Sequence, residues 1–114
     1  MEEKNAIPFK TLTVGDRDYM LRLTAGAAIR LEERLGGSVY SGLKRLDEIT
    51  VVIEFLYALI EGFSSDFSRA SAALLFDDFI TEGGSLKKMN GIICEAMERS
   101  GFFDCGEAEK PPQS

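Results

Sequence analysis

The chain opens with an alternating pattern of apolar and polar positions. Residues 7–14, IPFKTLTV, place apolar side chains between threonines, which favour extended structure. GDRD at residues 15–18 supplies turn-forming residues, and the alternation resumes in YMLRL at residues 19–23. This pattern predicts an N-terminal β-hairpin. Because two strands alone are marginally stable in water, the hairpin packs on helices or pairs through an edge with another chain. That edge is a candidate partner surface unless the body of the domain covers it.

Helical spacing begins directly after the hairpin. Thr24 is a good N-cap residue, and Gly36 and Gly37 end the predicted helix because glycine accepts the left-handed conformation that follows a helix. At about 100° per residue the apolar side chains share a broad arc opposite the charged ones. The apolar arc contains Ala27, Ala28, Ile29, Leu31 and Leu35, and the charged side contains Arg30, Glu33 and Arg34.

One carboxylate, Glu32, falls inside this apolar arc. Burying a carboxylate is costly unless it is paired or hydrogen-bonded, so one hypothesis gives it Arg22 or another nearby donor as a partner. The alternative is a side chain at the edge of the apolar stripe that reaches water, which suits the rarity of fully buried glutamate.

The strongest helical segment lies in the middle of the chain. VYSGLKRL at residues 39–46 predicts a short helical turn broken at Gly42, after which Asp47 is expected to cap a long helix. That helix is apolar almost all round, which is typical of a central helix. Its polar positions, Asp47, Glu54 and Glu61, recur every seven residues. We expect a solvated stripe rather than a catalytic pair, because this spacing separates two carboxylates by about 10 Å.

A fourth helical segment follows a loop at residues 64–68. It is expected to run from Ser68 or Arg69 to Thr81 and to stop at the glycine pair 83–84. Its predicted apolar side contains Ala72, Ala73, Phe76, Phe79 and Ile80, with Asp77, Asp78 and Glu82 pointing away.

The last predicted helix covers residues 86–100. Ser85 caps its start, and Gly101 occupies the position of a left-handed C-terminal residue, which would fold Phe102 back onto Met97. One face carries Leu86, Met89, Ile93, Ala96 and Met97, and the other carries Lys87, Lys88, Glu95, Glu98 and Arg99.

These elements define one folding unit. At 114 residues the chain is long enough for a single modest core and too short for two. We expect a flexible N-terminus at residues 1–6, a single α-rich domain at residues 7–103, and a disordered C-terminal tail at residues 104–114 with two prolines. The predicted fold class is mainly α, a small domain of four to five helices with an N-terminal β-hairpin.

Charge and hydropathy narrow the class of partner. The formal net charge of −6 disfavours nucleic acid, whose phosphates need clustered basic side chains. The longest apolar run, VVIEFLYALI, is about half of the roughly 20 residues of a membrane span, and the N-terminus lacks the pattern of a secretory signal. We expect a cytoplasmic protein that does not enter membranes. Cys94 and Cys105 lack metal-ligand spacing and are expected to be reduced thiols.

Catalytic chemistry is missing from the sequence. The chain has no histidine, and its serines stand in caps and loops without a base to activate them. No nucleotide-binding, metalloprotease, hydrolase or calcium-loop motif occurs, and GGSLKK at residues 83–88 lacks the preceding strand and the spacing of a phosphate loop. The sequence therefore predicts a binding or assembly protein rather than an enzyme, with no cofactor and no metal.

Three segments carry a resemblance to a known family. YMLRLTAGAAIRLEERLGGSVYSGL, the apolar central helix, and DDFITEGGSLKKMNGIICEAMERSGFF appear in the same order as in the tail assembly chaperones of long-tailed phages and prophages of Gram-positive bacteria. The chain resembles that family over roughly residues 17–103. The most specific pieces are LRLTAGAAIRLEERLGG and the ending that runs from GGS to SGFF.

The resemblance implies a non-catalytic function. A member of this family would bind the tape measure protein in the host cytoplasm, keep its long helical apolar stretches soluble and help recruit the tail tube protein. It would be absent from the mature virion. The sequence also leaves open a structural tail or connector component of the same phage cluster, or a small helical regulatory protein. DNA binding by the last two helices is disfavoured because LKKMNGIICEAMERS carries three basic residues against two acidic ones.

Aromatic residues near the ends of the predicted elements are the candidate partner contacts. So small a core covers such positions poorly, and self-association or a partner protein can bury them. The alternative is that each of them merely completes the core or closes a helix end. The candidates are Tyr40, Phe63, Phe102 and Phe103.

Overall fold

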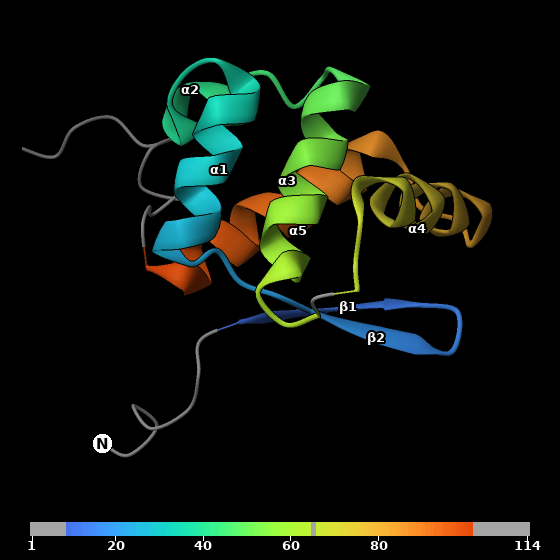
Figure 1. Ribbon diagram of the computed structural model, residues 1–114. Coiled ribbons are helices and arrows are strands. Elements are labelled where there is room, and N and C mark those ends of the chain that lie inside the picture. Colours follow the sequence, from blue (N-terminus) through green and yellow to red (C-terminus); the bar gives the residue numbers. More distant parts are fainter. Residues whose placement is uncertain (1–8, 65, 102–114) are drawn as a thin grey trace, which may run out of the picture.

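An antiparallel hairpin lies beneath a group of helices in the computed structural model, which describes residues 9–64 and 66–101 (Figure 1). The hairpin consists of β1 (Lys10–Val14) and β2 (Arg17–Leu21). Gly15 has a φ of 64°, as the first turn residue of a tight two-residue hairpin requires. The predicted N-terminal hairpin is confirmed.

The two faces of the hairpin differ sharply. Leu12 pairs with Tyr19, and Val14 pairs with Arg17, so these four side chains lie on one face. Leu12, Val14 and Leu21 are buried on that face against the helices. The other face carries Thr11, Thr13, Asp18 and Met20, all exposed.

Polar contacts fasten the hairpin to the helices. Lys10 Nζ lies 2.9 Å from Glu95 Oε1, and this hydrogen bond holds the pKa of Glu95 below its ordinary value. The Arg22 N–H donates to the Leu59 carbonyl at 2.9 Å. Both strands thereby gain a fixed position on the helical layer at the open end of the hairpin.

Serine and threonine side chains begin four of the helices. The side chains of Thr24, Ser38, Ser68 and Ser85 each accept a hydrogen bond from a backbone N–H in the first turn. The left-handed glycines expected at helix ends are present at Gly36 and Gly101, with φ of 74° and 90°. The described residues form α1 (Ala25–Leu35), α2 (Val39–Leu43), α3 (Ile49–Glu61), α4 (Arg69–Thr81) and α5 (Leu86–Ser100).

Two local predictions around α2 and α3 are wrong. Gly42 does not break the short helix; it lies buried inside α2. A Cβ placed there would lie 2.7 Å from Leu35 Cδ1 and 3.2 Å from the Phe55 ring, so the glycine permits close packing. The N-cap of α3 is Glu48 instead of Asp47, and it makes no side-chain capping bond.

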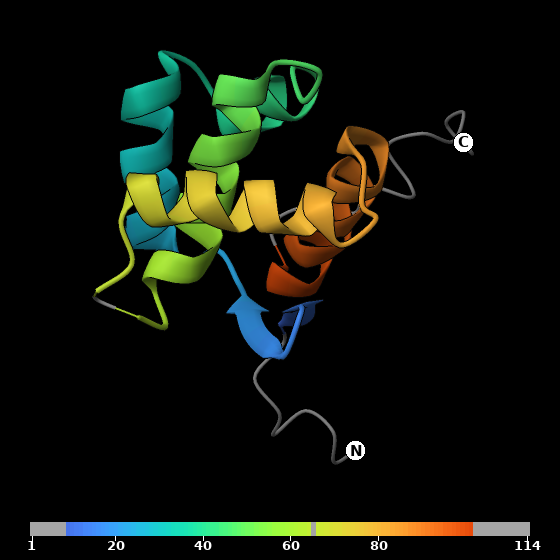
Figure 2. The same cartoon turned by 90° about the vertical axis from the view of Figure 1, so that its right-hand side faces the viewer.

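Helix α3 is the centre of the fold. It contacts α1 on one side and α4 on another, and it also contacts α5 and β2. Figure 1 shows α1 and α3 side by side above the hairpin, and Figure 2 shows α4 crossing the front of the helical group toward α5. The largest fully buried side chains are Phe55, Leu21, Leu23, Leu31, Leu56, Leu59, Met89, Ile93, Met97, Val51 and Val52.

Some positions on the predicted apolar faces are exposed instead. Ile29 is 60% exposed because it precedes the buried Leu31 by two residues, a rotation of about 200° that turns it to the opposite side. On α4, Ala73 and Ile80 are also exposed, while Leu75 is buried with Ala72. The contact line of α4 is therefore rotated away from the predicted arc. On α5 the predicted face is confirmed, with Met89, Ile93, Ala96 and Met97 buried and Leu86 partly buried.

Several predictions concern residues outside the described part of the chain. These are the flexible segment at residues 1–6, the tail at residues 104–114, the contact between Phe102 and Met97, and the thiol at Cys105. Within the described residues no helix is long and apolar enough to cross a membrane.

Candidate functional site

The predicted aromatic contacts do not form one cluster. Tyr40 on α2 is 45% exposed, and Lys44 Nζ lies 5.1 Å from the centre of its ring. Phe63 follows the other end of α3, is 36% exposed and packs edge-on against Phe9 at 6.1 Å between ring centres. The remaining two candidates, Phe102 and Phe103, lie outside the described residues.

Glu32 accepts a hydrogen bond from a backbone N–H group, a partner that cannot be inferred from the charges or the helical spacing of the sequence. Its side chain is exposed, and Oε2 accepts a hydrogen bond of 2.8 Å from the Val39 N–H at the start of α2. The observed donor is therefore Val39 and not the expected Arg22, whose Nε is buried without a hydrogen-bond partner among the described residues. Glu32 thus lies at the edge of the apolar stripe and ties α1 to α2 through a free backbone donor.

Replacing Glu32 by alanine is expected to lower the free energy of unfolding by about 1 kcal/mol, the usual cost of losing a capping acceptor. Chemical denaturation followed by circular dichroism measures this change. Glu33→Ala is the matched control, since Glu33 is the neighbouring exposed glutamate on the same helix. Equal losses for the two variants would mean that the Val39 bond contributes nothing.

Two members of the predicted stripe, Glu54 and Glu61, are paired with arginines and largely withdrawn from water, so the prediction of a solvated stripe is wrong for these two. Glu54 is only 8% exposed, and its carboxylate pairs with Arg34 Nε from α1 and, at 3.5 Å, with Arg69 Nε from α4. Glu61 pairs with Arg30 of α1 at 3.4 Å. Asp47 is exposed and precedes the helix. These pairs form an arginine–glutamate seam between α1 and α3.

The environment of Arg34 explains why the seam is structural. Its guanidinium lies 4.8 Å above the Tyr57 ring, a favourable cation–π distance. Arg34 Nη2 is buried and has no hydrogen-bond partner among the described residues. Glu54 therefore compensates a charge that is already partly desolvated.

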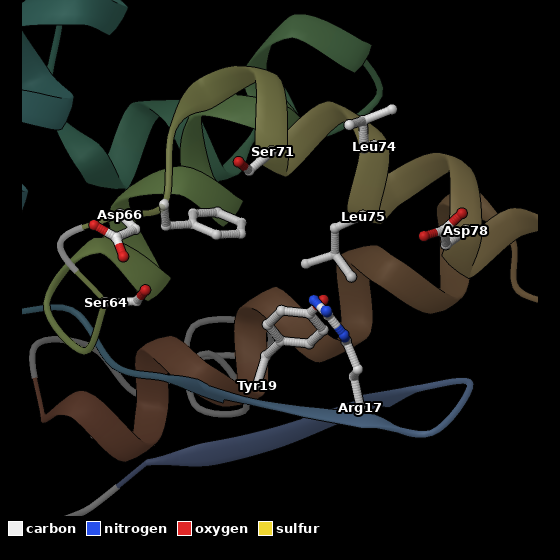
Figure 3. Close-up of a pocket in the computed structure, with 9 residues that line it drawn as sticks. Arg17, Tyr19, Ser64, Asp66, Ser71, Leu74, Leu75 and Asp78 are labelled. Carbon is white, nitrogen blue, oxygen red and sulfur yellow. The ribbon is translucent and has the colours of Figure 1, made fainter.

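A groove runs between β2 and α4 on another side of the molecule. Its larger hollow measures about 370 Å³, and an adjoining hollow of about 350 Å³ extends it past the hairpin turn. Figure 3 shows Tyr19 and Arg17 rising from β2 toward α4, with Leu75 opposite Tyr19 and with Asp66 and Asp78 toward opposite ends. The larger hollow is lined by Arg17, Tyr19, Ser64, Asp66, Phe67, Ser71, Leu74, Leu75 and Asp78.

The floor of this groove is aromatic and its rim is acidic. Tyr19 and Phe67 pack edge to face, with ring centres 6.3 Å apart. Arg17 is the basic side chain of the lining; the Tyr19 side chain raises its pKa most, and Asp16 and Asp78 add to the effect. The two hollows together are lined by four carboxylates, from Asp16, Asp66, Asp78 and Glu82.

Sequence reasoning identified the hairpin edge but missed this groove. Its walls come from segments about 50 residues apart, and no local periodicity joins them. The available signal was the acidic pair Asp77 and Asp78, which directly follows the apolar run AALLF at residues 72–76. Among the described residues no group of histidine, cysteine, aspartate and glutamate side chains is arranged to hold a metal ion.

Comparisons with known proteins identify no relative. No family model, curated protein or solved structure matches this chain.

Proposed function

We propose that this protein is a non-catalytic tail assembly chaperone of a long-tailed phage or prophage, which binds the tape measure protein and helps recruit the tail tube protein. The resemblance of residues 17–103 to that family names the partners. The proposal also includes self-association of the domain in the host cytoplasm and its absence from the finished virion.

The observation that supports this proposal is the outward face of α4. Leu74 is 64% exposed and Ile80 is also exposed, and the arc between them carries the exposed Ala70, Ala73 and Asp77. The opposite side of α4 packs into the core through Ala72, Leu75 and Phe76. Exposed leucine and isoleucine side chains on the side of a helix that faces away from the core offer apolar contact area, so a partner is expected on this side.

The family role needs such a surface. A chaperone for long apolar helices must offer apolar contact area that its client can cover, surrounded by charge that keeps the complex in solution. The net charge of −6 supplies that charge.

Co-expression with the tape measure protein of the same gene cluster tests the proposal. We expect a soluble complex on size exclusion, and Leu74→Glu is expected to reduce its recovery by about ten-fold, since a charge at the centre of an apolar contact is strongly unfavourable. Ile29→Glu is the matched control, because Ile29 is equally exposed but lies on α1. A tape measure protein that stays soluble and assembles tails without this chain contradicts the proposal.

The virion separates the proposal from the structural alternative. A chaperone leaves the assembled tail, so mass spectrometry of purified particles is expected to find none of this chain. Stoichiometric presence in the particles would instead identify a structural tail or connector component.

A further inference from the structure

We propose that the outer edge of β2, together with the groove beneath α4, binds an extended, basic segment of a partner protein as a third strand of the hairpin. This deepens the proposed function, because it names the chemistry of the client segment and the surface that receives it. It rests on the proposed function only for the identity of the partner.

The backbone of β2 has free hydrogen-bonding groups on its outer edge. The two-residue turn makes Val14 and Arg17 the hydrogen-bonded pair next to it, so alternate residues Asp18 and Met20 direct their N–H and C=O groups away from β1. The same phase continues to Arg22, whose N–H indeed points outward and donates to α3. Among the described residues no backbone group outside the hairpin bonds to Asp18 or Met20.

A strand added beside β2 would deliver its side chains into the groove. Successive side chains of a strand alternate between faces, so every second one would lie on the same side as Arg17 and Tyr19. That side faces the hollow beneath α4, where Tyr19 and Leu75 lie (Figure 3). Together with Phe67, these residues provide apolar contact for the stem of a long side chain. The other side chains of the added strand would join the exposed face that carries Met20.

The charges that line the groove determine which kind of partner segment it can bind. Four carboxylates and one guanidinium line the two hollows, so the groove favours lysine or arginine. Asp78 lines both hollows and is exposed. Glu82 lies beside the hairpin turn, where its Oε2 would be 3.8 Å from a Cβ placed on Gly15.

The same charges disfavour the chain itself as the occupant. The protein carries a net charge of −6. Its two terminal segments, residues 1–8 and 102–114, each contain more acidic than basic residues. The β2 sequence RDYML has no net charge. A foreign basic segment is therefore the best electrostatic match for the groove.

Binding of a defined peptide to the full chain tests the inference. The probe is a fluorescein-labelled eight-residue peptide of alternating lysine and threonine, measured by fluorescence polarisation. The comparison peptides replace lysine by glutamate, or keep lysine and carry an N-methyl group on every backbone amide. We expect binding of the first peptide only, because the glutamate peptide has the wrong charge and the methylated one lacks the N–H donors of a strand. Equal binding of the methylated peptide would overturn the inference and leave a purely electrostatic contact.

Two aspartates on α4 give a matched pair of variants. Asp78→Asn is expected to weaken binding of the lysine peptide by about five-fold, the upper range for one exposed charge pair. Asp77→Asn makes the same charge change at the next residue, which is exposed but does not line the groove, and it should leave the affinity within error. Equal effects of the two variants would show that the peptide does not occupy the groove.

Hydrogen exchange identifies the edge directly. The lysine peptide is expected to slow exchange of the Asp18 and Met20 amides by about ten-fold, since each gains an acceptor. Thr11 and Thr13 occupy the corresponding positions on β1 and should be unchanged. Protection on β1 alone, or on neither strand, would contradict the inference.

The experiments separate this inference from the proposed function. If the tape measure protein co-purifies with the chain while these peptides fail to bind, only the groove inference fails. If the peptides bind but no tape measure complex forms, only the proposed function is refuted.

Discussion

Replacing Glu54 by glutamine is expected to lower the free energy of unfolding by about 3 kcal/mol, the lower end of the range for breaking a buried ion pair from one side. Glutamine keeps the shape of the side chain but removes the charge that compensates Arg34. Arg34 cannot turn fully to water, because its guanidinium packs over Tyr57 and part of it is buried. The loss therefore reflects an unpaired, partly desolvated cation, and urea unfolding followed by circular dichroism measures it.

A surface pair and a double variant control this result. Glu48 pairs with Arg45 within an exposed turn, so Glu48→Gln should cause no measurable change. Combining Glu54→Leu with Arg34→Met removes both charges together and is expected to restore much of the stability, because apolar replacement of a buried pair is often neutral. A double variant as unstable as the sum of its single variants would show that the two residues act independently.

The local signals in the sequence predicted the secondary structure well. Thr24 and Ser85 stand directly before helical spacing, and Gly36 and Gly101 stand directly after it, so each boundary could be inferred from a few neighbouring residues. The hairpin was equally local, because the turn and the alternation lie within 15 residues.

The pairing of charges could not be inferred in the same way. The seven-residue spacing of Glu54 and Glu61 is visible in the sequence, but whether these carboxylates face water depends on what packs against them. The arginines Arg30 and Arg34 repeat at four residues on α1, and α1 lies antiparallel beside α3, so each arginine meets one glutamate. The row of glutamates on α3 does not by itself show that the arginines on α1 will face it. That pairing follows only from how the two helices pack together.

The groove illustrates a second limit. Tyr19 and Phe67 come from a strand and a loop that are remote in the sequence, and their ring contact arises only when the loop after α3 turns back over β2. An exposed helix face such as that of α4 is similarly hidden, because Leu74 and Leu75 are equally apolar and only the docking of α4 decides which one is buried.

The largest loss of stability is expected for Phe55→Ala, about 4 kcal/mol, typical of removing a fully buried aromatic ring. Phe55 lies on α3, and its ring edge would be only 3.2 Å from a Cβ placed on Gly42 of α2. The cavity would therefore open at the junction of α2 and α3, where glycine has no side chain to fill it. Thermal and urea unfolding of the variant measure the change.

Phe63→Ala provides the matched control for that loss. Phe63 has the same side chain but is 36% exposed, so its removal should cost less than about 1.5 kcal/mol, a partial share of the burial energy of a phenylalanine.

A second variant, Gly42→Ala with Phe55→Ala, tests whether the two positions share the same space. The added methyl group would occupy part of the cavity, so the double variant is expected to be more stable than Phe55→Ala alone, whereas Gly42→Ala in the intact chain should be destabilising because of the 2.7 Å approach to Leu35. If the methyl group destabilises both backgrounds equally, the cavity lies elsewhere and the close approach of α2 to Phe55 does not set the packing at this junction.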